Sequence, residues 1–339
     1  MARSAVVAKS DDADGVSRHA GGSARRLAPA LLLAAVLVDP FAFFQPTVRV
    51  EPAERDALSK GTAFARAVPA PPRHVAIVAA VPVHIDGARL VAWINDIAAL
   101  KKSPMVRQVG RFSALPSVDD LRDLTLDDVD AREVATCRPM TCGVKLTAQE
   151  ISHIRAAMRP GHPPGDPAVQ HAFREVVVAR ALNYLHDGGD GTEPPAFLTT
   201  NWPAISHDLR AFPLRVAPGA EHFLYWAKDV FAGKPVVSVT HVTIVKGTPP
   251  AEPEVLVIGR QVFATHYIDG TWSLTSLVRD GDRRYLVYVN QSEIDLLDAW
   301  YAGLVRRVVE HRVRDEAVEV LNGLRRRLES GDPPVQRGQ

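Results

Sequence analysis

The hydrophobic pattern of the C-terminal third of the chain predicts several β-strands followed by one long helix. Runs of β-branched and aromatic residues, separated by turn signals, are typical of strands. The runs cover residues 236–245, 255–268, 272–278 and 285–290, and the turn signals are residues 246–250, 269–270 and 280–282. The last two turn signals contain Asp-Gly pairs, which tolerate the positive φ of tight turns. Connections this short join antiparallel neighbours, so the pattern predicts an antiparallel sheet.

Apolar residues then recur at three- and four-residue steps from Leu304 to Leu328, which is the spacing of one helical face. The opposite face carries arginine and glutamate, an arrangement typical of a solvated surface. Gly331 and the following Pro333-Pro334 form a helix-stop pattern. We therefore predict a long amphipathic C-terminal helix that grips a curved sheet.

An earlier part of the chain predicts the strand and helix that begin the same domain. Apolar residues alternate along residues 75–85, as in a strand with one face against a core. Asp86 follows as a helix N-cap, and residues 90–100 supply the apolar side of that helix. The helix ends at residues 103–104, Ser-Pro, and residues 106–112 favour another strand.

The middle of the chain, residues 115–220, predicts mainly helices. Thr147 and Glu150 have the spacing of a capping box, and residues 173–185 have a strong helical pattern. Residues 199–231 are rich in aromatic side chains. We interpret this middle as a helical insertion that covers one end of the sheet, with a small second domain as the alternative. The predicted fold class is α+β, with a single domain over residues 61–330.

The N-terminal segment is set apart from the fold by its composition. Residues 1–26 are polar, small and unpatterned, which predicts disorder. Residues 27–44 are mostly apolar and follow Arg25-Arg26, a pattern that favours a signal peptide or an uncleaved membrane anchor over a buried core helix. We therefore expect an exported protein, periplasmic or otherwise outside the cytoplasm, with membrane contact through this segment.

The two cysteines, Cys137 and Cys142, fit this expectation. In an exported protein a local disulfide is their expected state, whereas their four-residue gap does not match redox or zinc motifs. The formal net charge of +1 gives no electrostatic case for nucleic-acid binding. No phosphate loop, dinucleotide fingerprint, nucleophile elbow or zinc-binding histidine pair is present in the sequence, and we predict no metal or cofactor.

The order of these elements resembles a known superfamily. The strand at 75–85, the helix Val-Ala-Trp-Ile-Asn-Asp-Ile with Trp93 and Asp96, the Ser-Pro that follows and the closing strands and helix resemble helix-grip domains. That superfamily includes START lipid-transfer proteins and polyketide cyclase-like proteins. The resemblance implies a cavity for an apolar ligand between sheet and helix, and it implies no shared catalytic residues. The long middle segment departs from the usual pattern.

Three polar residues on predicted strand faces and three nearby aromatics are the candidate ligand-binding residues. Polar side chains on an apolar face need partners or a wet cavity, which a ligand head group in an apolar pocket would supply. The candidates are His241, Arg260, His266, Tyr267, Trp272 and Tyr288. The alternative is that these strand faces meet the insertion and that the aromatics belong to the core.

We expect a binding or transfer protein for an apolar or amphipathic small molecule, such as a lipid, and no catalytic residue is predicted. One alternative is a cyclase- or hydrolase-type enzyme on the same fold, with His241 or His266 as general base. The other is a structural envelope protein that acts through its insertion, which exposed aromatics over residues 199–231 would favour.

Overall fold

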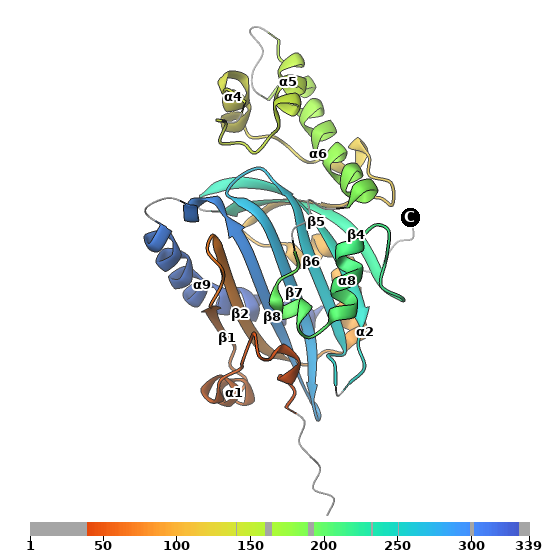
Figure 1. The fold of residues 1–339 in the computed structure, drawn as a ribbon, viewed down its shortest axis with the longest axis vertical. Helices are drawn as coiled ribbons and strands as arrows, with labels where there is room; N and C mark the ends of the chain where they lie inside the picture. The colour runs from red at the N-terminus through yellow and green to blue at the C-terminus, as the bar shows by residue number, and fades with distance from the viewer. Residues whose placement is uncertain are drawn as a thin grey trace, which may run out of the picture. The chain divides into compact units, whose positions relative to one another are not determined.

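The computed structural model describes residues 39–139, 141–159, 165–188, 193–231, 233–249, 251–298 and 302–331. The predicted disordered tail and most of the predicted leader lie outside these residues. Within the part described, an eight-stranded antiparallel sheet has the strand order β1-β2-β8-β7-β6-β5-β4-β3 (Figure 1). The strands are β1 (Phe64–Val68), β2 (His74–Val83), β3 (Val106–Arg111), β4 (Glu221–Phe231), β5 (Lys234–Lys246), β6 (Val255–Ala264), β7 (Ile268–Asp280) and β8 (Arg283–Ile294). The sheet is not closed, because β1 and β3 are its two edges.

Helices precede, interrupt and follow the strands. They are η1 (Ala42–Phe44), α1 (Pro52–Ser59), α2 (Gly87–Asn95), α3 (Ile97–Lys101), η2 (Val118–Leu121), α4 (Asp128–Thr136), α5 (Ala148–Ala156), α6 (Pro167–Asp187), α7 (Ala196–Thr199), α8 (Pro203–Ala211), η3 (Asp295–Asp298) and α9 (Ala302–Ser330). Those from η2 to α8 lie between β3 and β4 in the chain. The predicted α+β class, the antiparallel sheet and the C-terminal helix are confirmed.

Two predicted helix starts have the expected caps. The Asp86 carboxylate accepts a hydrogen bond from Arg89 N (2.8 Å), and α2 begins at the next residue. At α5, Thr147 and Glu150 form the reciprocal contacts of a capping box. These local signals were sufficient because each uses a side chain within one helical turn of the backbone group that it satisfies.

The turn between β6 and β7 is not where the Asp-Gly pair predicts it. β6 ends at Ala264, and the chain reverses over residues 265–267, where Tyr267 has a φ of 60°. Asp269 and Gly270 lie inside β7, at a register irregularity. The Asp269 carboxylate is paired with Arg73 (2.9 Å) and with Lys145, so it joins three segments instead of forming a turn.

Residues 39–44 belong to the folded core, although the apolar pattern assigns them to the leader. Phe41 and Phe44 are 3% and 0% exposed, and they pack with residues of the sheet. Asp39 accepts two hydrogen bonds from the guanidinium of Arg55, at 2.6 and 2.8 Å. The predicted boundary at residue 44 is therefore too late. No helix among the described residues combines the length and apolarity that a membrane crossing requires.

The two faces of the sheet are covered by different helices. Alternation along the strands places Val78, Leu274 and Val287 on one face, where they pack with Ile205 and Leu209 of α8. We call this the α8 face, and α8 is drawn across it in Figure 1. The neighbouring residues Ala79, Leu277 and Leu286 point to the opposite face, where they pack with residues of α2, α3 and α9. We call this the α9 face.

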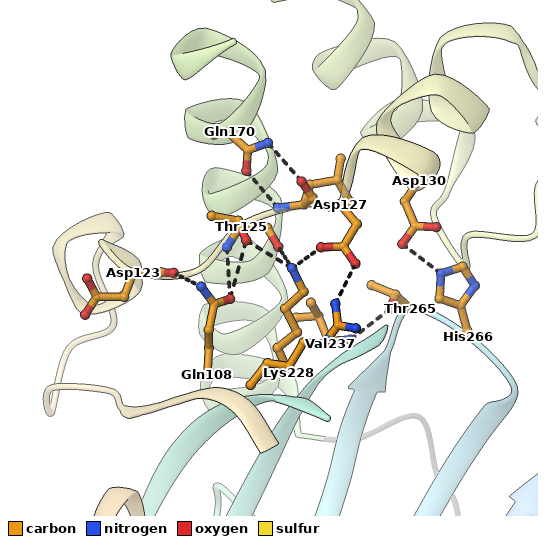
Figure 2. Close-up of polar contacts among 12 residues, drawn as sticks. Gln108, Asp123, Thr125, Asp127, Asp130, Gln170, Lys228, Val237, Thr265 and His266 are labelled. Atoms are coloured by element: carbon orange, nitrogen blue, oxygen red, sulfur yellow. Dashed lines mark hydrogen bonds and ion pairs between the residues drawn. The ribbon is translucent and has the colours of Figure 1, made fainter. Parts of the chain in front are cut away.

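Buried polar side chains fasten the helices that follow β3 to the sheet (Figure 2). Gln170 on α6 accepts a hydrogen bond from Leu126 N (2.7 Å) and donates one to Leu126 O (3.0 Å). Lys228 on β4 donates to the carbonyl oxygen and hydroxyl of Thr125, at 2.9 and 3.0 Å, and also contacts Asp127. These side chains fix the loop between η2 and α4, because its polar groups would otherwise be buried without partners.

Candidate functional site

A cleft of about 790 Å³ lies between α9 and the sheet. Its walls come from the α9 face of β2, β7 and β8, from the segment near β3 and β4, and from α9 itself. The lining residues are Ile77, Ala79, Met105, Val230, Phe231, Thr275, Leu286, Tyr288, Ile294, Leu296, Leu304, Val305, Val308, Val309, Ala317, Val320, Leu321 and Leu324. None of these residues carries a charge, so the described part of the cleft suits an apolar molecule.

The cleft is open to solvent along part of α9. Large apolar side chains that line it are exposed: Leu304 by 61%, Val320 by 66% and Met105 by 51%. Further along α9, Leu321 and Leu328 are 6% and 0% exposed and pack with the sheet. Leu321 and Leu328 therefore close one end of the cleft, while Leu304, Val308 and Val320 of the same helix present exposed apolar side chains.

A cluster of polar groups lies close to one residue of the cleft lining. Tyr288, on β8, is a lining residue. Lys101, at the end of α3, places Nζ 3.3 Å from Asp229 Oδ2 and 5.1 Å from the ring centre of Tyr225, both on β4. Burial and, to a smaller extent, Tyr225 raise the pKa of the Tyr288 hydroxyl to about 12, while Lys101 opposes the shift. Burial lowers the pKa of Lys101, but Tyr225 and Asp229 outweigh burial and hold it above its usual value.

Three of the predicted site residues lie on the other side of the sheet. His241 and Arg260 are directly paired across β5 and β6, and Arg260 is in turn paired with Trp272 of β7. All three are on the α8 face, since Trp272 packs with the cluster beneath α8. The expectation that His241 and Arg260 orient a head group under α9 is therefore wrong, because the sheet separates them from the cleft.

These residues form a tightly packed group of aromatic and basic side chains. Tyr184 on α6 places its hydroxyl 2.7 Å from His241 Nδ1, and the ring of Phe212 is 4.3 Å from that of His241. Arg260 lies 5.0 Å from the ring of Trp272. Burial, together with smaller effects of the neighbouring His222 and Arg260, lowers the pKa of His241 to about 3. His241 is therefore a neutral, packed side chain.

His266 and Tyr267 occupy the β6–β7 turn. Figure 2 shows His266 pointing toward Asp130 of α4, with Nε2 3.0 Å from Asp130 Oδ2, and its Nδ1 lies 2.8 Å from the carbonyl oxygen of Gly143. Burial favours the neutral carboxyl of Asp130, but His266 and Lys234 outweigh it and lower its pKa. Both ring nitrogens of His266 are hydrogen-bonded within the protein, to Gly143 and Asp130. His266 therefore holds the β6–β7 turn against α4 and does not make the predicted ligand contact.

Of the six predicted residues, only Tyr288 lines the cleft. Lys101, Tyr225 and Asp229 were not predicted as polar neighbours of the site. A lysine at the end of a helix and an aspartate in a strand look like surface residues, and only the fold brings them to the cleft. The apolar face of residues 304–328 was the usable signal, because it predicted the helix that forms one wall.

A second cleft, of about 750 Å³, lies beside the β7–β8 turn and has a polar lining. Three of its four lining arginines hold the protein's own groups: Arg284 contacts Glu254 (3.1 Å), Arg325 donates to Gly61 O (3.0 Å) and Arg89 donates to Leu328 O (2.6 Å). This cleft is therefore a weaker candidate than the apolar one. Within the described ranges no group of three or more His, Cys, Asp or Glu residues is arranged to hold a metal ion.

Comparisons with known proteins do not assign a family. No family model matches the chain, and no curated protein matches it. The crystal structure of TTHA0849 from Thermus thermophilus is similar at 16% sequence identity over 33% of this chain and 70% of that chain, with a TM-score of 0.26. A similarity of this extent carries no argument about fold or function.

Proposed function

We propose that the protein binds an apolar or amphipathic small molecule in the cleft between the sheet and α9, with α9 gripping the ligand against the sheet. The cleft itself is the observation that supports this function. Its volume of about 790 Å³ falls within the usual range for ligand pockets, about 300–1,000 Å³. Its described lining is uncharged, so the transfer of an apolar ligand from water into the cleft is favourable.

Ligand binding would also cover apolar surface that the protein leaves in contact with water. Leu304, Val308 and Val320 are each about half exposed or more while lining the cleft. Each Å² of apolar surface removed from water contributes about 25 cal/mol, so these side chains would add to affinity. Entry and release would require the N-terminal part of α9 to move away from the sheet.

The proposed location is outside the cytoplasm. The structure pairs Cys137 with Cys142 in a disulfide, with a Cα–Cα distance of 5.3 Å. Disulfides persist mainly in oxidising compartments, which supports the export inferred from the N-terminal apolar segment. Most of that segment lies outside the described residues.

The alternative functions receive less support. An enzyme that uses His241 or His266 would need one of them in a cleft, whereas His241 is packed against Tyr184 of α6 and Phe212, and His266 is engaged with Asp130 and Gly143. A structural role for the insertion would need exposed aromatics over residues 199–231. Phe212, Phe223 and Trp226 are buried, and Trp202 is half-buried.

Filling the cleft tests the proposal. Ala317 lines the cleft on α9, so Ala317→Trp should occupy part of its volume. We expect the wild-type protein, purified from cells, to carry a hydrophobic species by native mass spectrometry, and the variant to carry less than about a tenth as much. A loss of that size corresponds to about 1.4 kcal/mol of binding free energy.

The matched control is Ala98→Trp, which makes the same change at an exposed position of α3. This variant should retain the bound species and melt within a few degrees of the wild type. A wild-type protein that carries no ligand and shows no thermal shift with a panel of long-chain amphiphiles would contradict the proposed function.

A further inference from the structure

We propose that the cleft selects molecules whose polar end is uncharged, such as a long-chain alcohol, and that Tyr288 and Asp229 receive this end. This inference deepens the proposed function and rests on it. Three observations support it: the position of the polar groups near the cleft, the pairing of their charges, and the hydrogen-bonding atoms that can still accept or donate to a ligand.

Strand alternation fixes the position of the polar groups relative to the cleft. Met105 and Val230 line the cleft, and Val230 N donates to Met105 O at 2.8 Å. Alternation on β4 puts Asp229 on the same face as Tyr225, which packs on the α9 face, and as Phe231, which lines the cleft. The Lys101–Asp229 pair therefore lies on the same face of β4 as the part of the wall that Phe231 forms.

Curvature of the sheet brings the opposite wall close. Tyr225 on β4 and Tyr288 on β8 are four strands apart in the sheet order. In a flat sheet this separation would be about 19 Å, at roughly 4.8 Å per strand. Yet Tyr288 and Phe231, at the end of β4, line the same cleft, and Tyr225 and Lys101 both influence the pKa of the Tyr288 hydroxyl. Tyr288 and the Lys101–Asp229 pair therefore face the same interior.

A ligand that reaches this part of the cleft would meet charges that are already paired with each other. Lys101 and Asp229 neutralise each other at 3.3 Å, and the side chains are only 25% and 34% exposed. A carboxylate would have to compete with Asp229 for Lys101, and an ammonium group would have to compete with Lys101 for Asp229. Either ion would lose its hydration without gaining an unpaired partner, which is costly in an apolar cleft. An uncharged polar group avoids this cost.

One acceptor and one donor beside the cleft can form hydrogen bonds with a ligand. Asp229 Oδ1 is buried, and no hydrogen-bond donor for it is present among the residues that the structure describes. Buried acceptors are rarely left in this state, so a donor from a ligand or water is expected. The Tyr288 hydroxyl stays protonated at neutral pH, and besides its hydrogen bond with Asn290 it can donate to a ligand oxygen. A hydroxyl group serves both positions, since it donates to Asp229 and accepts from Tyr288.

A set of ligands with one chain length and different ends tests the inference at neutral pH. Dodecanol, laurate and dodecylamine would each displace an environment-sensitive fluorophore from the full-length protein. We expect dodecanol to bind at least about ten times more tightly than either ion, which is about 1.4 kcal/mol. Equal or tighter binding of laurate or dodecylamine would overturn the inference while leaving the proposed function in place. If no compound binds, the proposed function fails, and the inference fails with it.

Two variants assign the selectivity to residues. Tyr288→Phe removes one hydroxyl, so dodecanol should bind about fivefold more weakly. Tyr285→Phe makes the same change on the α8 face of β8 and should leave binding unchanged. Asp229→Asn removes the charge that neutralises Lys101, and laurate should then bind at least about tenfold more tightly than it does to the wild type. An unchanged dodecanol affinity in Tyr288→Phe, or an unchanged laurate affinity in Asp229→Asn, contradicts the assigned roles.

Discussion

Lys228→Met should destabilise the protein by about 3 kcal/mol, because it removes the donor on which a buried loop depends. The Lys228 side chain is 4% exposed, and its ammonium group contacts the carbonyl oxygen and hydroxyl of Thr125 and the carboxylate of Asp127 (Figure 2). Methionine fills a similar volume but leaves these oxygens without their donor. Asp127 keeps Arg107 at 3.6 Å, so we expect the lower end of the usual range of about 3–5 kcal/mol.

Urea denaturation followed by far-UV circular dichroism measures this loss of unfolding free energy. Lys60→Met is the control, since Lys60 forms an ion pair with Asp56 at 2.6 Å but is 69% exposed. An exposed pair of this kind should contribute less than about 0.5 kcal/mol. Equal losses in the two variants would show that the burial of Lys228 is not what matters.

The parts of the fold that could be predicted from the sequence are those encoded by local periodicity. Alternation over residues 75–85 predicts β2 because one face of that strand meets a core, and the apolar stripe of residues 304–328 predicts α9. β4 was not predicted as a strand, because Glu221, Lys228 and Asp229 interrupt its apolar pattern. Lys228 is nevertheless buried, and the reason is its partner loop, which lies about a hundred residues earlier in the chain.

At the candidate site, too, local periodicity predicts the elements but not which elements pack together. Alternation along the strands shows that the side chains of His241 and Arg260 point to the same face of the sheet. It does not indicate which helix covers that face. The fold puts α8 there, and it puts α9 over the face that holds Tyr288. The Lys101–Asp229 contact joins residues 128 positions apart, so no spacing in the sequence indicates it. The cleft wall was predictable, whereas the polar end of the cleft was not.

Acid should destabilise the protein through His241 well above the pH at which carboxylates titrate. Burial lowers the pKa of this histidine from 6.5 to about 3, so below pH 6.5 the unfolded chain binds a proton that the folded protein does not. Stability is therefore fully present above pH 6.5 and falls by about 1.4 kcal/mol per pH unit as the pH decreases toward 3. Between about pH 6.5 and about pH 4.5 we expect a loss of roughly 2–3 kcal/mol. Burial also lowers the pKa of His222, which adds to the loss in the same direction.

The pH window separates this histidine from the acidic groups. The lowered pKa values of Asp39 and Asp130 make their contributions disappear only below the usual value of 3.8, outside the range measured. His241→Gln keeps an acceptor for the Tyr184 hydroxyl but cannot titrate, so its unfolding free energy should change much less between about pH 6.5 and about pH 4.5. His84→Gln alters a side chain that is 93% exposed and should follow the wild-type curve. If His241→Gln retains the full wild-type slope, the acid sensitivity comes from other groups, and the burial of a neutral His241 does not control it.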